Sequence, residues 1–528
     1  MCGIFAYINN GPFNEKHIFK QFEKGKSRGP ESTNQLTREY YNNTIFLGFH
    51  RLAINGLNKE SNQPISINSI YLICNGEIYN YRNFNINFIT KSDCEVIIHL
   101  YILYGIDYLF ELLDGVFSFV LFDKNINKVY VARDPYGVRP LYYSTINGLV
   151  FASEIKQINE ISTNIKHFEP GTYMEITLHP TNYPKIYKKK YTSFGFTKLI
   201  FNNLYDIYGI FYQILYNAVK KRVIGTTDRP IACLLSGGLD SSTITALVNS
   251  FLPPGVLETY SIGLENSTDL ISAEKVAKHL GTKHTSIVLT ENEFFDAIPE
   301  VIHSIETYDT TTIRASVGNY LIGKYIKEHS DAKVIFNGDG ADELMGGYLY
   351  FNKAPSSIEF DRECKRLLNN IHYFDVLRSD RCISTHGLEP RTPFLDRSLV
   401  QFYLSIPNDL RFHKLNNQPE KFLLRGAIEF MNKDLLPLEI LYRTKEAFSD
   451  GVSGLNRSWY QIIQEKIPKM ENFKVYTHLQ PQTDEQRYYR SLFEEKYPDC
   501  SDIVPYFWMP KYTNATDPSA RTLKEYQV

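Results

Sequence analysis

The sequence lacks the features that mark several large classes of protein. No apolar run reaches the roughly 18 residues that a transmembrane helix needs, and the chain does not start with a basic leader and an apolar stretch. The formal net charge is only −2, so no basic excess predicts nucleic-acid binding. These absences predict a globular protein of the cytoplasm that binds neither a membrane nor a nucleic acid.

Cysteine is scarce and scattered. The chain has 7 cysteines, an odd number, and none belongs to a CxxC pair. Neither a disulfide framework nor a structural zinc site is therefore expected, and no HExxH motif supplies another metal site. The cysteines are Cys2, Cys74, Cys94, Cys233, Cys364, Cys382 and Cys500. This pattern is typical of a reducing compartment, in agreement with the cytoplasm.

The sequence does contain enough apolar material for several domains. Its 528 residues are 43% hydrophobic and 22% charged, which is typical of a folded chain longer than one domain. In the first third, short β-branched and aromatic runs separated by turns predict strands, and one segment with helical spacing predicts a helix. The strands are residues 3–8, 45–54, 69–79, 116–123, 128–134, 140–144 and 148–154, and the helix is 92–113, with Ser92 or Asp93 near its start. Strands with helices outside predict an α+β layered domain.

The pattern changes after residue 199. Strands predicted at residues 230–235, 257–264, 284–289 and 332–337 alternate with helices predicted at 205–223, 241–251, 272–281 and 293–307. Such alternation predicts an α/β unit with a parallel, doubly wound sheet, followed by a mainly helical part from residue 350. We predict domains at 1–190 and 200–528, with the proline-containing basic stretch 178–190 as linker. Residues 455–528 show no motif.

The first candidate site begins at Cys2. Removal of Met1 would leave a thiol and a free α-amine on one residue, and an amine with a pKa of about 8 can act as general base to its own side chain. A cysteine at position two also occurs by chance. The predicted strand that follows it argues against chance, because a strand fixes the terminus in a sheet.

Polar clusters at the ends of other strands can complete such a site. Asn75 and Gly76 offer two donors for an oxyanion hole, Arg51 offers a bidentate cation for a carboxylate, and Asp93 offers an anion for an ammonium group. Each has a structural alternative, because Asn-Gly is common in turns and Asp93 could cap a helix.

Residues 1–172 resemble the glutaminase domain of N-terminal-nucleophile (class II) glutamine amidotransferases. The shared segments are MCGI, RGPE, HRLAI, NGEIYN, SDCEV, LDGVFSFVLFD, RDPYGVRPLYY, FASEIK and PGTY, in that order. The resemblance implies that Cys2 is the nucleophile and that Asn75 and Gly76 form the oxyanion hole. The glutamine pocket that it implies consists of Arg51, Leu52, Ala53, Ile54, Asn55, Asn75, Gly76, Glu77 and Asp93. Ser27, where the family usually has His, and Glu31, where it usually has Asp, depart from the pattern at its periphery.

The second candidate site is the segment Ser236–Ser242, SGGLDSS, which follows a predicted strand and opens a helix. Its glycines allow close backbone approach, and its hydroxyl and N–H groups at a helix N-terminus can cradle an anion. It is not a Walker A loop, because no Lys-Ser/Thr pair follows at the required spacing. The acidic segment Asn337–Glu343, NGDGADE, follows another strand of the predicted parallel sheet. The two loops are expected in one crevice, where Asp240 and Asp342 could hold Mg²⁺.

The SGGLDSS segment resembles the pyrophosphate-binding loop of ATP pyrophosphatases. The residues Ser304–Asp309, Thr311–Ser316, Gly346–Pro355, His386–Asp396 and Lys445–Gly451 extend the resemblance to glutamine-hydrolysing asparagine synthetases over residues 1–454. It implies that Lys445 stabilises the pyrophosphate and that Asp339, where the family often has Glu, orients or deprotonates ammonia. The ATP-binding residues that it implies are Leu234, Ser236, Gly237, Gly238, Asp240, Ser241, Ile262, Asn337 and Gly338.

The resemblance implies a two-stage reaction. Aspartate would attack the α-phosphate of Mg-ATP to give β-aspartyl-AMP and pyrophosphate, and ammonia from glutamine would then displace AMP. An internal passage for ammonia and a homodimer are further expectations. Two alternatives stay open: a related amidotransferase with another carboxylate acceptor, and a catalytically silent relative. The intact Cys2, SGGLDSS and KEAFSDG segments argue against the silent relative.

Overall fold

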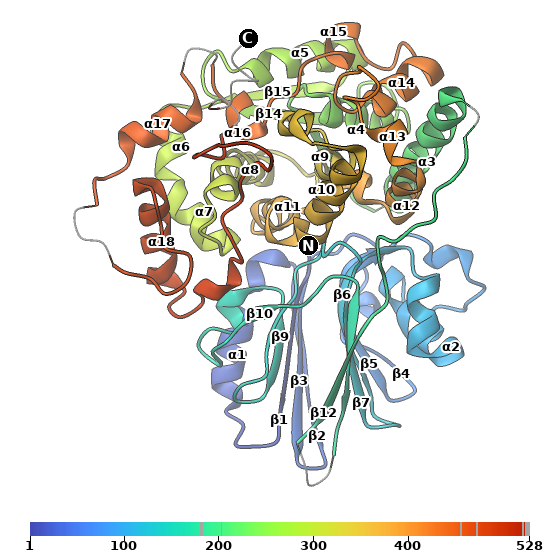
Figure 1. The fold of residues 1–528 in the computed structure, drawn as a ribbon. Helices are drawn as coiled ribbons and strands as arrows, with labels where there is room; N and C mark the ends of the chain where they lie inside the picture. Colours follow the sequence, from blue (N-terminus) through green and yellow to red (C-terminus); the bar gives the residue numbers. More distant parts are fainter. Residues whose placement is uncertain are drawn as a thin grey trace.

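A computed structural model describes residues 1–179, 183–201, 203–226, 228–454, 457–470, 474–519 and 522. The chain forms two units, and its N-terminus lies where they meet (Figure 1). The first unit contains two antiparallel sheets, and the second contains a parallel sheet surrounded by helices. Among the described residues, no helix has the length and apolarity needed to cross a bilayer.

The first unit is built on two six-stranded sheets. The first sheet has the order β10-β8-β9-β1-β3-β2, and the second has the order β12-β11-β7-β6-β5-β4. Strands of the first sheet are β1 (Gly3–Asn9), β2 (Ser32–Tyr40), β3 (Asn43–Arg51), β8 (Tyr142–Ser144), β9 (Leu149–Ala152) and β10 (Lys166–His167). Strands of the second are β4 (Ile65–Ile67), β5 (Ile70–Ile78), β6 (Gly115–Asp123), β7 (Lys128–Arg133), β11 (Thr172–Thr177) and β12 (Lys185–Lys190).

Alternation along β1 shows how the layers arise. Ile4 and Ala6 pack with Val120 of β6 between the two sheets, whereas Phe5 packs with Phe22 of α1 (Glu15–Glu23) on the outer face. On the outside of the second sheet lies α2 (Val96–Leu112). Because both faces of the central strands β1, β3 and β6 are covered, these strands are apolar on both sides. The α+β layered prediction is confirmed.

Two details of the first unit differ from the sequence analysis. Residues 185–190 were expected in a linker, but they form the exposed edge strand β12, paired antiparallel with β11. Backbone pairing, rather than burial, holds this lysine-rich strand, and lysine suits an exposed edge. The helix expected at 92–113 begins as a 3₁₀ turn (Asp93–Glu95) and is kinked at Gly105, whose φ of 76° is left-handed. The limits 1–190 and 200–528 stay a prediction, and residues 180–182 of the expected linker lie outside the described residues.

The second unit has one five-stranded parallel sheet in the order β15-β14-β13-β16-β17. Its strands are β13 (Ile231–Leu234), β14 (Glu258–Gly263), β15 (Lys283–Val288), β16 (Val334–Phe336) and β17 (Glu389–Arg391). From β13 the chain adds β14 and then β15 on one side of the sheet. It later adds β16 and β17 on the other side of β13. The carboxyl ends of β13 and β16 therefore form the switch point at which such sheets bind ligands.

Helices surround this sheet and form the rest of the second unit (Figure 1). The helix expected at 293–307 is broken into two, α6 and α7, with Pro299 in the first turn of the second. The helices are α3 (Leu204–Ile224), α4 (Leu239–Asn249), α5 (Thr268–Leu280), α6 (Glu291–Asp296), α7 (Ile298–Ile305), α8 (Thr310–His329), α9 (Ala341–Met345), α10 (Ser357–Asn370), α11 (Asp375–Ser384), α12 (Arg397–Ser405), α13 (Asn408–Arg411), α14 (Phe422–Met431), α15 (Leu438–Leu441), α16 (Phe448–Gly451), α17 (Trp459–Lys466) and α18 (Asp484–Lys496). The predicted α/β unit with a helical C-terminal part is confirmed.

Buried ion pairs join the two units. Among the described residues, five buried arginine–carboxylate pairs cross the interface, and the arginine comes from the first unit in three of them and from the second unit in the other two. The pairs are Arg28–Asp380 at 2.8 Å, Arg139–Asp380 at 3.9 Å, Arg139–Glu389 at 3.7 Å, Arg381–Glu154 at 2.7 Å and Arg391–Glu77 at 3.2 Å. Their side chains are at most 6% exposed. Removing one partner would leave a buried charge uncompensated, which makes the interface specific for this arrangement.

We predict that Asp380→Asn lowers the free energy of unfolding by about 3 kcal/mol, because Arg28 would remain buried with only the more distant Glu154, at 3.8 Å, as a counter-ion. Urea unfolding followed by tryptophan fluorescence measures this loss, since Trp459 and Trp508 both lie buried in the second unit. Glu439→Gln is the matched control: its pair with Lys275 has side chains 59% and 49% exposed, so its loss should cost under about 1 kcal/mol. Equal effects of the two substitutions would contradict the role of the buried pair.

Candidate active sites

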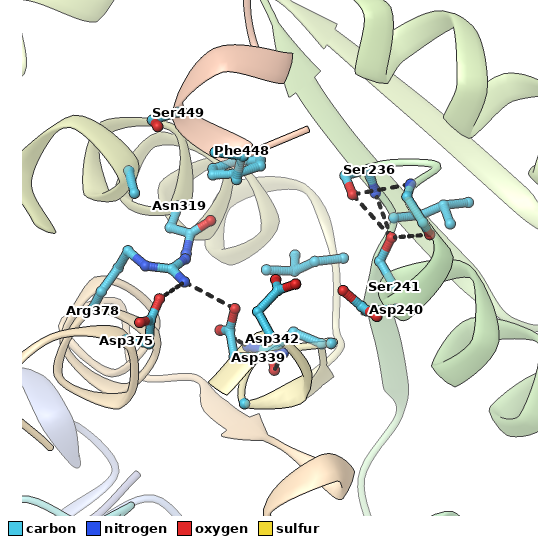
Figure 2. A pocket seen from close by; sticks show the side chains of 18 of the residues that line it. Ser236, Asp240, Ser241, Asn319, Asp339, Asp342, Asp375, Arg378, Phe448 and Ser449 are labelled. Atoms are coloured by element: carbon cyan, nitrogen blue, oxygen red, sulfur yellow. Dashed lines mark hydrogen bonds and ion pairs between the residues drawn. The ribbon is translucent and has the colours of Figure 1, made fainter. Parts of the chain in front are cut away.

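The SGGLDSS and NGDGADE segments meet in one pocket at the switch point of the parallel sheet (Figure 2). The first segment joins β13 to α4, and the second joins β16 to α9. Most of the predicted nucleotide-binding residues line this pocket: Leu234, Ser236, Gly238, Asp240, Ser241, Ile262, Asn337 and Gly338. The predicted residues Asp339 and Asp342 line it as well. The structure confirms that the two loops line one crevice, which we call the switch-point pocket.

Hydroxyl groups hold the SGGLDSS loop in place. Ser241 Oγ accepts a hydrogen bond from the Ser236 backbone N–H at 3.2 Å, and the two hydroxyls lie 3.0 Å apart. Gly237 has a φ of 72°, and a Cβ there would lie 2.4 Å from the backbone of Ser272 and Ala273. This glycine therefore shapes the loop from behind and does not line the pocket itself.

Asp339 lies opposite this loop and is held from two sides (Figure 2). Arg378 of α11 donates to its Oδ1 at 3.0 Å, and Asn337 Nδ2 donates to its Oδ2 at 2.8 Å. Arg378 also pairs with Asp375 at 2.9 Å. Helix α11 therefore fixes a carboxylate on the wall of the pocket. The sequence analysis did not single out Arg378 or Asp375.

Two lysines bind the acidic residues that were predicted to hold metal. Lys445 Nζ lies 2.7 Å from Asp342 Oδ2, and Lys421 Nζ pairs with both Asp342 and Asp240. Burial raises the pKa of Asp342, but the two lysines outweigh burial and lower that pKa to about 2. Lys445 lines an adjoining pocket together with Lys421 and Asp240, next to the switch-point pocket. Lys421 was not predicted, because a single lysine outside any motif carries no signal.

A second pocket surrounds Cys2, and we call it the Cys2 pocket. Its walls contain nearly all of the predicted glutamine-binding residues: Cys2, Arg51, Leu52, Ile54, Asn55, Asn75, Gly76, Glu77 and Asp93. Ala53 does not line it. Its N–H donates to Glu31 at 2.8 Å, and its carbonyl accepts from Arg229 at 2.8 Å. Glu389 of β17, a residue of the second unit, also lines this pocket.

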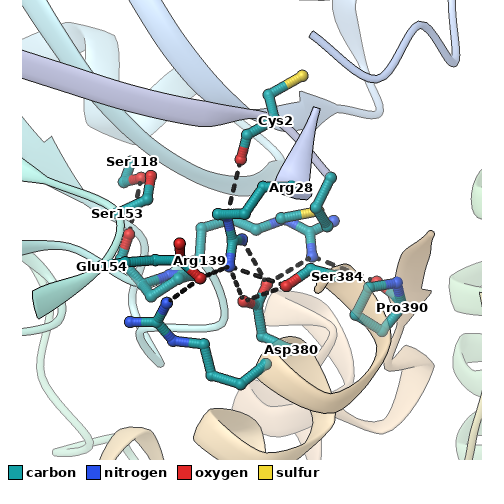
Figure 3. Close-up of polar contacts among 12 residues, drawn as sticks. Cys2, Arg28, Ser118, Arg139, Ser153, Glu154, Asp380, Ser384 and Pro390 are labelled. Carbon is teal, nitrogen blue, oxygen red and sulfur yellow. Dashed lines mark hydrogen bonds and ion pairs between the residues drawn. The ribbon is translucent and has the colours of Figure 1, made fainter. Parts of the chain in front are cut away.

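A hydrogen bond to its backbone carbonyl holds Cys2 in place, and burial alters the pKa of its thiol. Its carbonyl accepts from Arg28 Nε at 3.0 Å, and Arg28 in turn forms a fork with Asp380 of α11 (Figure 3). Cys2 Sγ lies 3.5 Å from the Leu52 carbonyl, and burial raises the pKa of the thiol to about 11. The preceding amine of Met1 donates to the Leu388 carbonyl at 3.0 Å, and burial lowers the pKa of that amine to about 5. The Met1 amine is therefore neutral near pH 7.

Asn75 presents its amide inside the Cys2 pocket. The side chain is fully buried on β5, and neither its Nδ2 nor its Oδ1 has a hydrogen-bond partner among the described residues. Because a buried amide without a partner is costly, this amide is suited to a polar ligand group. Gly76 follows it, and a Cβ there would lie 2.5 Å from the Val116 carbonyl. The close approach of β6 therefore requires glycine at this position.

Arg51 lines the Cys2 pocket, but the chain already engages its guanidinium. One terminal nitrogen donates to the Asn58 carbonyl at 2.9 Å and to Asn62 Oδ1 at 2.7 Å, and the other donates to the carbonyls of Asn55 and Gly56. In this structure Arg51 therefore shapes the loop after β3. Binding of a ligand carboxylate would require some of these bonds to be exchanged, so the clamp predicted for Arg51 stays a prediction.

The acidic residues of the Cys2 pocket are buried. Burial, with the backbone N–H of Ile78 acting in the opposite sense, raises the pKa of Asp93 to about 6. The pKa of Glu77 is raised by burial and by the neighbouring Asp93 and Glu389, while Arg391 acts against this increase. Glu77 also accepts from Asn55 Nδ2 at 3.0 Å. Asp93 does not cap α2 but accepts from the Ile78 backbone N–H at 2.6 Å, so it faces the end of β5.

Family models match both units of the chain. The model described as "Asparagine synthase" matches residues 211–359 and 353–514, and the model described as "Glutamine amidotransferase domain" matches residues 1–192. The asparagine synthetase [glutamine-hydrolyzing] of Bos taurus is 41% identical over 573 residues, which cover 100% of this chain and 99% of that protein. The Homo sapiens protein of the same name is 41% identical over 569 residues, with the same coverage. A solved structure titled "Structure of the allosteric regulatory enzyme of purine biosynthesis" covers 54% of this chain and 80% of that chain at 15% identity, and its TM-score of 0.32 is too low to support an argument.

The two family matches coincide with the two units. The switch-point pocket lies in the second unit, and the Cys2 pocket lies in the first unit except for Glu389. Full-length identity of 41% to curated relatives leaves no part of either pocket outside the match. The chain therefore belongs to the family of glutamine-hydrolysing asparagine synthetases.

Proposed function

We propose that this protein makes L-asparagine from L-aspartate and ATP with ammonia released from L-glutamine, and forms glutamate, AMP and pyrophosphate. One observation carries the proposal: a half-buried Cys2 with an unpartnered amide in its pocket, and a phosphate-type loop at a switch point, occur in one chain whose two units are joined by buried ion pairs. Its relatives are named for this combination. The presence of both sites in one chain is explained if the ammonia released in the Cys2 pocket is consumed by the ATP-dependent reaction in the switch-point pocket.

In the first stage, the thiol of Cys2 attacks the side-chain amide carbon of glutamine. After removal of Met1, the α-amine of Cys2 would take the thiol proton. The Asn75 amide and the Gly76 N–H would stabilise the oxyanion. Ammonia leaves, and water then hydrolyses the glutamyl thioester to glutamate. Arg51 and Asp93 would hold the two ends of the amino-acid head group.

In the second stage, a carboxylate oxygen of aspartate attacks the α-phosphorus of ATP and displaces pyrophosphate. An oxygen of a free carboxylate is a very poor leaving group. After this step the leaving group is AMP, which departs readily. The SGGLDSS loop would hold the pyrophosphate, with Lys445 and Lys421 beside it. Ammonia then attacks the activated carbonyl carbon, and AMP leaves. Asp339, fixed by Arg378, would take a proton from the attacking nitrogen.

The carboxylates of Asp240 and Asp342 fit a magnesium ion. Both are oxygen donors on the wall of the nucleotide pocket, and Asp240 Oδ1 is buried with no hydrogen-bond partner among the described residues. Mg²⁺ usually binds through one or two carboxylates and the phosphates of its nucleotide. When bound here, it would neutralise phosphate charge. No group of three or more His, Cys, Asp or Glu residues suited to a metal occurs in the described part of the chain, so the nucleotide would have to complete the ligand set.

A continuous apolar cluster supports internal transfer of ammonia between the pockets. Leu52 and Ile54 line the Cys2 pocket, and Leu235 lines the switch-point pocket. All three belong to one cluster of buried residues that also contains Val116 and Leu395. Apolar surroundings favour neutral ammonia over the ammonium ion, because burial disfavours a charge.

Product analysis tests the proposal directly. Incubation with Mg-ATP, glutamine and aspartate should give asparagine, AMP and pyrophosphate in equal amounts, measured by mass spectrometry. Asp240→Ala should release no pyrophosphate but should still hydrolyse glutamine, because Asp240 lies in the other pocket. ADP in place of AMP would contradict adenylation, and amidation of another acid in preference to aspartate would favour the alternative acceptor.

We predict that Cys2→Ala lowers glutamine-dependent asparagine formation by at least about a thousandfold, because it removes the nucleophile. Synthesis from added ammonium chloride should stay within about twofold of the wild type, since only the first stage is lost. Both rates can be read from the asparagine formed. Retention of glutamine use by this variant would exclude Cys2 as the nucleophile.

The pKa of Asp93 predicts how kcat/KM for glutamine falls at acidic pH. Burial raises this pKa to about 6, so the carboxylate loses its charge as the pH falls through that value. Below pH 6 the kcat/KM for glutamine should therefore fall about tenfold for each pH unit, because the anion that holds the substrate ammonium is lost. Asp93→Asn should have a low kcat/KM at pH 8 and lack this limb. A wild-type profile that stays flat down to pH 5 would contradict the role of Asp93.

A further inference from the structure

Lys421 occupies the centre of the acidic cluster beside the nucleotide pocket. Its ammonium group lies 2.5 Å from Asp342 Oδ1 and pairs with Asp240 Oδ2 as well. The side chain is 2% exposed, and those of Asp240 and Asp342 are 13% and 12% exposed. One buried cation therefore bridges the two carboxylates that fit a metal ion.

The surrounding backbone is built to admit this lysine. Lys421 has a left-handed φ of 58° at the start of α14, which is uncommon for a residue with a side chain. A Cβ at Gly347 would lie 2.0 Å from Lys421 Cε and 2.2 Å from Asp342 Oδ1. The absence of a side chain at Gly347 thus leaves space for the end of the Lys421 side chain. The left-handed backbone at Lys421 is the conformation in which its ammonium group contacts both carboxylates. A surface lysine needs neither feature.

The charges of the cluster balance as they stand. Asp240 and Asp342 carry two negative charges, and Lys421 and Lys445 carry two positive charges. A divalent cation that approached this cluster alone would have to displace an ammonium group from a largely buried site, which would leave that charge without a partner. A cation that arrives with a triphosphate brings a new anionic partner for the displaced ammonium. Exchange is then favourable for both cations.

We propose that Lys421 acts as a placeholder for the metal: it blocks the Asp240–Asp342 pair against a free divalent cation and gives it up when the metal arrives with ATP. Lys421 would then turn from the carboxylates to the phosphates. The inference rests on the proposed ATP chemistry of this pocket and adds an order of binding: the metal enters together with the nucleotide and not before it. Metal binding depends on the nucleotide because a residue of the chain holds the metal position beforehand.

The test measures Mn²⁺ affinity by electron paramagnetic resonance on the full-length protein, with and without a non-hydrolysable ATP analogue. The wild type should bind Mn²⁺ weakly alone and at least about tenfold more tightly with the analogue. Lys421→Met should bind Mn²⁺ alone at least about tenfold more tightly than the wild type, because the two carboxylates lose their internal cation. The dependence on the nucleotide should shrink in the same variant.

Two further variants separate the possible causes. Lys275→Met removes a lysine from a half-exposed surface pair and should leave Mn²⁺ affinity unchanged. Lys421→Arg keeps the positive charge and should bind Mn²⁺ alone as weakly as the wild type. Glutamine hydrolysis in the Cys2 pocket checks that each variant is folded, and Lys421→Gln replaces Lys421→Met if the latter fails this check.

The outcomes distinguish this inference from the proposed function. If the wild type binds Mn²⁺ with the analogue but Lys421→Met binds Mn²⁺ alone no more tightly than the wild type, the placeholder is refuted and the ATP site stands. If the wild type fails to bind Mn²⁺ even with the analogue, the ATP site is refuted and the placeholder with it. Tighter binding of Mn²⁺ alone by Lys421→Met, but not by Lys275→Met, supports the placeholder.

Discussion

The buried fork between Arg28 and Asp380 is the interaction on which the arrangement of this protein depends. Arg28 Nε donates to the carbonyl of Cys2, and the carboxylate that forms hydrogen bonds with the same guanidinium, Asp380, comes from the second unit. Neither group is stable in this place alone, because a buried charge without a partner is strongly unfavourable. The Cys2 pocket is therefore complete only when the two units are docked. Glu389 of β17 in the wall of that pocket has the same consequence.

Helix α11 transmits this constraint toward the switch-point pocket. Within ten residues it carries Arg378, which pairs with Asp375 and donates to Asp339, Ser379, which accepts from Asn337 at 2.7 Å, and Asp380, which pairs with Arg28. A shift of this helix would move a carboxylate in one pocket and the support of Cys2 in the other. The geometry thus supplies one rigid element that both sites contact, which is the physical requirement for coupling them.

Sequence reasoning predicted what local patterns encode. Alternating apolar runs gave most of the strands, the strand–loop–helix order gave the SGGLDSS and NGDGADE loops, and parallel pairing brought them together at the switch point. It could not find Lys421 or Arg378, or place Glu389 of the segment His386–Asp396 in the Cys2 pocket, because the contacts of each depend on residues far away in the chain. It also misjudged residues 185–190, since a lysine-rich edge strand is held by backbone pairing and leaves no apolar signal. Folding, not local pattern, creates these contacts.

The two pockets use buried charge in opposite ways. In the Cys2 pocket burial dominates: it raises the pKa of Asp93 to about 6 and lowers that of the Met1 amine to about 5, so both groups change charge in mildly acidic solution. At the switch-point pocket the lysines outweigh burial and keep Asp342 ionised far below neutral pH. The difference suits the two chemistries. Acyl transfer at a thiol needs a group that can accept a proton, whereas binding of a metal with a polyphosphate needs carboxylates that stay charged and cations that can change partner.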